Sequence, residues 1–213
     1  MKREKAFKIG LLISLIPLII GLYFYGQVPD LMPTHFDFNN EPDRYSSKEF
    51  ALFGLPLIMI GVYILVYFLT KVDPRRKYQS EKVEKVMNIT LLIIPIVSIL
   101  TTLFTIFYTL GHRPNLGMWI NIFISILFIF IGNYMPKIRR NYTMGIKLPW
   151  TLHSDYVWDK THRLGGMVFV IGGVINLIMS FISLRFTFVT YLLIVVIPIV
   201  YSYLVYRGLG NEE

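Results

Sequence analysis

The sequence contains no cysteine, so it has neither a disulfide framework nor a thiol nucleophile. It also lacks the HExxH, GxSxG, P-loop and paired-cysteine patterns that mark several large enzyme classes. No Asp, Glu, Lys or Arg lies in the central part of its long apolar runs. This last absence argues against an ion-coupled carrier, because such proteins usually place ionisable groups near the middle of the bilayer.

Long apolar runs dominate what is present. Hydrophobic residues make up 54% of the 213 residues, which is more apolar surface than one soluble core of this size can bury. A helix needs about 20 apolar residues to cross the hydrocarbon of a bilayer. The sequence therefore predicts an all-α membrane protein with six transmembrane helices: Phe7–Tyr25, Phe50–Thr70, Met87–Leu110, Leu116–Met135, Leu164–Leu184 and Phe186–Tyr206. The first run has no small-x-small cleavage pattern, so we expect it to be retained.

Basic residues are distributed unevenly among the connecting segments. Only four of the 21 Lys and Arg residues lie in the segments that follow the first, third and fifth spans: Arg44, Lys48, Arg113 and Arg185. The positive-inside rule therefore predicts three hairpins, with the N-terminus and the C-terminus both cytoplasmic. The basic residues follow span ends and form no single stripe. The net charge of +8 thus favours attraction to the lipid bilayer over direct binding of nucleic acid.

The connecting segments divide the chain into four regions. Residues 1–70 are expected to form a two-helix unit with an ordered acidic outer loop at 27–49. Residues 71–115 hold a charged cytoplasmic linker and the third helix, and we interpret Lys71–Val86 as a simple linker that could extend that helix. Residues 116–206 hold the last three spans and a cytoplasmic loop at 136–163, and 207–213 form a tail.

Small residues and prolines predict packing features inside the spans. Glycines recur seven residues apart in the fifth span and predict a seam where another helix approaches closely: Gly165, Gly166, Gly172 and Gly173. Prolines in four spans predict kinks: Pro17, Pro56, Pro95 and Pro198. The amide side chains within the spans include Asn121, Asn133 and Asn176.

The loop at 27–49 is acidic and patterned like ordered structure. Apolar and polar residues alternate from Thr34 to Asn39, which predicts a short strand followed by a turn. Ser46–Glu49 fits a capping box that opens the second span. A net negative, aromatic-bearing outer surface favours contact with a cationic peptide, and the candidates are His35, Asp37, Glu41 and Asp43. A metal site at the same residues is the weaker interpretation, because their spacing matches no ligand rule.

The loop at 136–163 holds two of the three Trp and two of the four His. Gly145–Thr151 predicts a turn that ends in an extended X-Pro pair. Ser154 is placed to cap a helix that runs into the fifth span. One face of that helix would suit the membrane interface, where Trp rings lie at headgroup level: Trp150, Ser154, Val157, Trp158 and Thr161.

Asp155, Asp159 and His162 would share another face of that helix. Such a line resembles an acid/base or metal array, which would suit a membrane enzyme. The favoured interpretation is a capped helix start with an ion pair between Asp159 and Arg163, because pairs four residues apart form easily. We therefore rank an enzyme lowest and expect no catalytic residue, no metal and no cofactor.

The run Met144–Leu152, followed by Ser154, Val157-Trp158 and Thr161–Arg163, resembles the signature of the SdpI family. In that signature a Gly-Ile-Arg/Lys-x-Pro-Trp-Thr-Leu run precedes a Trp and then a helix. The resemblance extends upstream through Gly132–Pro136. In the outer loop, Pro29-Asp30, Pro33–Phe36, Pro42-Asp43 and Ser47-Lys48 resemble the domain of unknown function often fused N-terminal to this signature.

The resemblance implies a six-span immunity protein of the bacterial cytoplasmic membrane that protects its host from a secreted, membrane-active peptide toxin of the SDP type on the outer face. It also implies a signalling role in which the inner loop holds a cytoplasmic transcriptional regulator at the membrane. The partner-binding candidates it implies in that loop are Gly145, Pro149, Trp150, Thr151, Trp158, His162 and Arg163. The alternative is a small transporter or permease for an uncharged or peptide solute.

Overall fold

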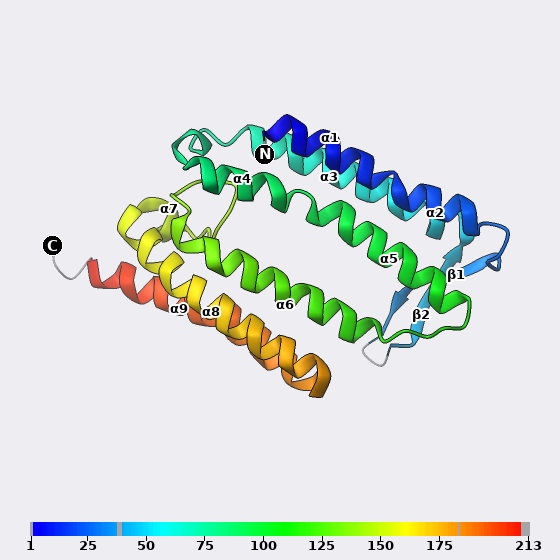
Figure 1. The fold of residues 1–213 in the computed structure, drawn as a ribbon. Helices are drawn as coiled ribbons and strands as arrows, with labels where there is room; N and C mark the ends of the chain where they lie inside the picture. Colours follow the sequence, from blue (N-terminus) through cyan, green and yellow to red (C-terminus); the bar gives the residue numbers. More distant parts are fainter. Residues whose placement is uncertain (1, 38–39, 183, 210–213) are drawn as a thin grey trace. The chain divides into compact units, whose positions relative to one another are not determined.

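Six long apolar helices dominate the computed structural model, which describes residues 2–37, 40–182 and 184–209 (Figure 1). Within these residues, the helices long and apolar enough to cross a membrane are Arg3–Phe24, Phe50–Lys71, Val83–Thr109, Leu116–Lys137, Asp155–Ile182 and Phe186–Leu209. The prediction of six spans is confirmed, although the fifth begins at Asp155 and not at Leu164. Phe38 and Asn39 of the predicted strand and turn, and residues 210–213 of the tail, lie outside the described residues.

The chain forms two compact units that are interleaved in sequence. The first unit comprises residues 1–72 and 85–116, and the second comprises 73–84 and 117–213. Residues 73–84, which the sequence places in a linker before the third span, thus group with the last three spans. Each unit is described separately below.

Helices α1 (Arg3–Ser14), α2 (Ile16–Phe24), α3 (Leu55–Lys71) and α5 (Ile93–Thr109) pack together in the first unit (Figure 1). Proline explains their irregularities, because it lacks the N–H that the helix ladder requires. Pro17 follows the break between α1 and α2, and Pro95 follows the break between α4 (Glu81–Thr90) and α5. Pro56 follows a turn of π-helix, Phe50–Gly54. In contrast, Pro198 lies inside an unbroken helix, α9 (Leu184–Leu209).

A tyrosine on α3 fixes the packing of α1 in this unit. Tyr63 is fully buried, and its hydroxyl donates to the carbonyl oxygens of Ala6 (3.2 Å) and Phe7 (3.1 Å). Phe7 stacks on Tyr63 and on Tyr67. Gly10 leaves room for the phenol, since a Cβ there would overlap it. The polar end of a buried tyrosine is therefore satisfied by α1 backbone, as burial requires.

The outer loop is a β-hairpin, so the fold is not purely α-helical as the sequence predicts. Strand β1 (Leu31–Phe36) pairs antiparallel with β2 (Pro42–Ser47), with irregular register around His35. The predicted strand is confirmed over the described residues. The predicted cap is displaced by one residue: Ser47, not Ser46, accepts from the Phe50 N–H (3.3 Å). Ser46 is instead paired with Met32 across the hairpin.

In the second unit, α8 (Asp155–Ile182) contacts α6 (Leu116–Tyr134) and α9 through glycines on two faces. A Cβ on Gly166 would lie 2.7 Å from the carbonyl oxygen of Gly132 on α6, and the reverse substitution meets the same distance. Gly173 similarly faces the Ser125 carbonyl. On the other face, Gly172 meets Ile194 of α9. The predicted glycine seam is confirmed, and it serves two neighbouring helices.

A buried polar cluster joins the three long helices of this unit. Asn121 on α6 donates through Nδ2 to the Asn176 carbonyl (3.0 Å) and to Ser180 Oγ (2.7 Å), both on α8. Tyr191 on α9 donates its hydroxyl to Asn121 Oδ1. Asn133, the third amide of the spans, is exposed and lies outside this cluster. Interhelical hydrogen bonds of this kind hold helices together where hydrophobic burial contributes little.

We expect Gly166→Val to destabilise the protein by about 1–3 kcal/mol or to reduce its membrane yield, because the new side chain meets rigid backbone. Heating the detergent-solubilised protein and measuring the remaining monodisperse fraction tests this. Gly61→Val is the matched control, since a Cβ at Gly61 on α3 meets nothing within 4 Å. Equal loss for both variants would contradict the close approach of α6 and α8.

Candidate functional site

The inner loop, 136–163, begins within the short 3-10 turn Met135–Lys137 and includes α7 (Pro149–His153) and the start of α8. Its centre is a stacked pair, Trp158 and His162, with ring centroids 3.9 Å apart. Both side chains are almost completely buried, at 0% and 1% exposure. Trp158 Nε1 donates to the Ile138 carbonyl (2.7 Å). Trp158 therefore lies inside the protein and does not face lipid headgroups as expected for it.

His162 holds the turn that precedes α7. Its Nε2 lies 3.0 Å from the Ile146 backbone nitrogen, and its Nδ1 lies 2.8 Å from the Trp158 carbonyl oxygen. A backbone N–H can only donate and a carbonyl can only accept, so these partners assign a neutral ring with the proton on Nδ1. Protonation of Nε2 would set two donors against each other. His162 is thus a structural acceptor.

Gly145 sits directly against this pair. Its φ of +127° is a conformation that residues with a side chain rarely adopt. A Cβ there would overlap His162 Nε2 and lie 2.9 Å from the Trp158 ring. The turn at Gly145 therefore depends on both the conformational freedom and the small size of glycine.

Thr151 and Trp150 attach α7 to its surroundings. Pro149 starts the helix at a position where its missing N–H costs nothing. The buried Thr151 hydroxyl accepts from the Leu148 N–H (2.9 Å) and donates to the Ile146 carbonyl (2.8 Å). Trp150 Nε1 donates to Ser202 Oγ on α9 (2.9 Å). Because α7 ends before Ser154, Trp150 lies on a different helix from the α8 residues expected to share its face.

The Asp155–Asp159–His162 array expected as one alternative does not form. Ser154 caps α8 as expected, accepting from the Val157 N–H (3.4 Å). Asp155 and Asp159 then lie on the exposed side of α8, whereas His162 points inward to Trp158. The side-chain direction separates them, since the His162 ring stacks on Trp158 and accepts from the Ile146 N–H. Arg163 is exposed.

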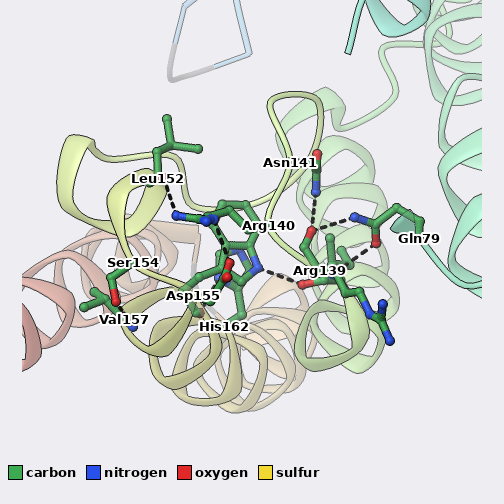
Figure 2. A network of polar contacts seen from close by, with 11 residues as sticks. Gln79, Arg139, Arg140, Asn141, Leu152, Ser154, Asp155, Val157 and His162 are labelled. Atoms are coloured by element: carbon green, nitrogen blue, oxygen red, sulfur yellow. Dashed lines mark hydrogen bonds and ion pairs between the residues drawn. The ribbon is translucent and has the colours of Figure 1, made fainter. Parts of the chain in front are cut away.

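Arg140 and Asn141 organise the loop, and neither was singled out from the sequence. Asn141 is fully buried and uses its whole side chain, as Figure 2 shows in part. Its Oδ1 accepts from the N–H groups of Thr143 and Met144, and its Nδ2 donates to the carbonyls of Arg139 and Met144. The sequence signal, Asn-x-Thr, is the one shared by glycosylation sites, and here it marks a turn.

Arg140 connects the loop to both helices that follow it (Figure 2). Its Nη1 donates to the Leu152 carbonyl at 2.8 Å. Its Nε lies 2.6 Å from Asp155 Oδ1, but the N–H does not point at that oxygen, so the contact is an ion pair without a good hydrogen bond. Because Asp155 is 76% exposed, solvent screens this attraction strongly.

Residues 73–84 are more than the simple linker that the sequence predicts. The Gln79 side chain forms two hydrogen bonds with the backbone of Arg139: it accepts from the N–H (3.0 Å) and donates to the carbonyl (2.6 Å). Asp73 Oδ2 accepts from the Tyr142 N–H (2.9 Å) and the Thr143 hydroxyl (2.6 Å). The guanidinium of Arg75 lies over the Tyr142 ring. This segment therefore forms part of the candidate site.

The four outer candidates all lie in the β-hairpin region, exposed to solvent. His35 Nδ1 lies 2.6 Å from Asp43 Oδ1. Asp37 Oδ1 accepts from the Glu41 N–H (2.9 Å), and Glu41 Oε2 accepts from the Tyr108 hydroxyl (3.1 Å). Within the described residues, no group of three or more His, Cys, Asp or Glu is arranged to hold a metal ion.

Side-chain hydrogen bonds and an ion pair hold the hairpin in place at its tip and at its base. At the tip, Asn40 donates to the Pro114 carbonyl (3.1 Å) and accepts from the Leu116 N–H (2.8 Å). At the base, Tyr25 donates to Glu49 (2.8 Å), and this hydrogen bond lowers the pKa of the Glu49 carboxyl. The bond to Asp30 (2.8 Å) raises the pKa of Lys48. The carboxylates are thus presented on an ordered hairpin.

Comparison with known proteins bears on both regions. Residues 137–202, which contain most of the inner loop, match the model of the SdpI/YfhL protein family. The chain is SdpI-like. Residues 12–60, which contain the hairpin, match a domain of unknown function (DUF1648). The resemblance predicted from both loops is confirmed.

A relative that matches along nearly the whole chain shows the same similarity. The SdpI-like chain is 27% identical to Immunity protein SdpI of Bacillus subtilis (strain 168) over 210 residues, which cover 96% of this chain and 98% of that protein. No solved structure matches the chain significantly. Together with the six apolar helices, the similarity identifies a multi-pass protein of the bacterial cell membrane.

We expect Gln79→Ala to loosen the inner loop of this SdpI-like protein, because the Arg139 N–H loses its partner and the Arg139 carbonyl loses one of the two it has, keeping Asn141 Nδ2. Hydrogen exchange followed by mass spectrometry should show about tenfold faster exchange in residues 138–144, the change expected from losing one or two hydrogen bonds. Lys77→Ala is the control, since Lys77 is exposed, lies over the Tyr78 ring and has no hydrogen bond to residues 138–144 within the described part of the chain. Unchanged exchange in 138–144 would show that Gln79 does not hold the loop.

Proposed function

We propose that this chain protects its host from a secreted, membrane-active peptide toxin and transmits toxin binding to a cytoplasmic regulator. The observation that carries the proposal is the similarity to an immunity protein over nearly the whole of both chains. The site supports it, because the region that matches the family builds one ordered loop out of buried signature residues.

The proposal includes an orientation. We place both termini and the loop at 136–163 on the cytoplasmic side, with the six spans arranged as three hairpins. The distribution of Lys and Arg supports this, since the segments assigned to the outside carry only four of the 21 basic residues. The β-hairpin then faces outward, where a secreted peptide arrives.

The outer hairpin is the proposed toxin contact. Its carboxylates are exposed, yet the hairpin is ordered by cross-strand pairs and by its fastening through Asn40. An ordered acidic surface attracts a cationic peptide and loses less entropy on binding than a flexible loop would. His35, Asp37, Glu41 and Asp43 are the candidate contacts.

The inner loop is the proposed regulator contact, with two kinds of residue. Gly145, Thr151, Trp158 and His162 shape the loop from inside, as their contacts above describe. The exposed signature residues, Pro149 and Arg163, are available to a partner. The half-buried Trp150 attaches α7 to α9. Alanine at Trp158 would therefore disturb the loop itself, at a cost of about 3–5 kcal/mol, and is a poor test of partner contact.

Expression in a toxin-sensitive bacterium should preserve membrane potential and survival during challenge with an SDP-type peptide. Asp37→Asn/Glu41→Gln should reduce protection, most clearly at low salt, where attraction between exposed charges is least screened. Membrane potential and colony counts at matched membrane abundance are the measurements.

Glu4→Gln is the control, since exposed Glu4 lies in the first turn of α1, far along the chain from the hairpin. If wild type does not protect at all, the proposed immunity fails for that toxin. Protection that the hairpin variant retains in full at low salt would reject the hairpin as the electrostatic contact.

Arg163→Glu should reduce the amount of a candidate regulator that sediments with membranes after toxin challenge by several-fold, because it reverses an exposed charge at the proposed contact. Quantitative immunoblotting of membrane and soluble fractions measures this. Lys160→Glu makes the same charge change at an exposed position one turn earlier on α8. Equal recruitment by both variants and by wild type would exclude Arg163 from the contact.

A further inference from the structure

A charged cavity of about 540 Å³ lies in the second unit, beside the inner loop. Its volume is in the range of small-ligand sites. Three segments supply its lining: residues 73–84, the start of the inner loop and the first turns of α8. The lining residues are Arg75, Tyr78, Arg139, Arg140, Asp155 and Asp159.

The charges in this cavity are only partly matched within the protein. Arg140 and Asp155 form the ion pair described above. Within the described part of the chain, Arg75 Nη1 is buried without a hydrogen-bond partner. Neither the Arg139 guanidinium nor the Asp159 carboxylate has a partner there, although Figure 2 shows the Arg139 backbone fully engaged with Gln79 and Asn141.

The cavity is lined by the Arg139 guanidinium, the Asp159 carboxylate and the Arg75 guanidinium, which also lies over the Tyr142 ring. These three groups do not pair with each other. Guanidinium groups bind phosphate oxygens through charge-assisted hydrogen bonds. A carboxylate in the same cavity would repel a purely anionic ligand but would bind an ammonium group. The cavity is therefore complementary to a ligand that carries a phosphate and an ammonium side by side.

The position of the cavity indicates where such a ligand comes from. It lies where α6 has ended and α8 begins, so its lining is at the end of two membrane-spanning helices. Headgroups lie at this level in a bilayer, and basic pockets there bind lipid headgroups. Exposed tyrosines also occur at this end, as is typical of the membrane–water interface: Tyr78, Tyr142 and Tyr156.

We propose that this cavity binds the headgroup of phosphatidylethanolamine. Arg75 and Arg139 bind the phosphate, and Asp159 binds the ammonium group. The bound lipid would also connect residues 73–84 to α8, adding to the hydrogen bonds from Gln79 and Asp73. The proposal is independent of toxin binding and of any regulator.

The test is native mass spectrometry of the full-length protein released from nanodiscs made of equal parts phosphatidylethanolamine and phosphatidylglycerol. Wild type should retain phosphatidylethanolamine in preference. Arg139→Gln should lower retention about tenfold, as expected for losing one charge-assisted hydrogen bond. Asp159→Asn should abolish the preference for ethanolamine while keeping phosphate-dependent retention. Lys160→Gln, which removes an exposed positive charge outside the cavity, should match wild type.

Each alternative occupant gives a different result. Equal losses for Arg139→Gln and Lys160→Gln would show general attraction to the bilayer surface and overturn the proposal. Retention of phosphatidylglycerol in preference would reject the ammonium subsite. Displacement of the lipid by millimolar inorganic phosphate alone would identify a free anion as the ligand. Displacement by an acidic peptide but not by soluble glycerophosphoethanolamine would identify a protein partner instead.

Discussion

The inner loop depends on one constraint: its irregular backbone must find hydrogen-bond partners at the end of a membrane-embedded helix bundle. Residues 138–148 form neither helix nor strand, so side chains must supply what a ladder would otherwise supply. Asn141, His162 and Thr151 do so from within the loop and α8, and Gln79 and Asp73 do so from outside it. Most other features of the site follow from these bonds.

This constraint explains the structural roles of the signature residues. Gly145 leaves space for His162, which accepts from the turn, and Trp158 covers the ring and bonds Ile138. These residues determine the shape of the loop, and the side chains of Trp158 and His162 are buried. Under the proposed function, recognition falls to the exposed signature residues Pro149 and Arg163, so only part of the family motif would contact a partner.

Periodicity and length predicted the spans well, because a helix that crosses a bilayer must be long, apolar and free of central charge. The glycine seam was also predictable, since only packing explains small residues seven apart on one helix. The site was harder. Gln79 and Asp73 contact residues some 60 or more positions away, and no local pattern reports such pairings. Trp150 was wrongly expected to share a face with residues of α8, because α7 ends at His153 and Trp150 therefore lies on a separate helix.

The interleaving of the two units has a consequence for how this protein can be divided. The chain leaves the first unit at Val72, enters the second, returns at Lys85 and leaves again after Leu116. A gene fragment that begins at the fourth span would carry the family region yet lack Gln79 and Asp73. Its loop backbone would lose the partners that fix it. The boundaries suggested by sequence families therefore differ from those at which this polypeptide could be cut into self-sufficient pieces.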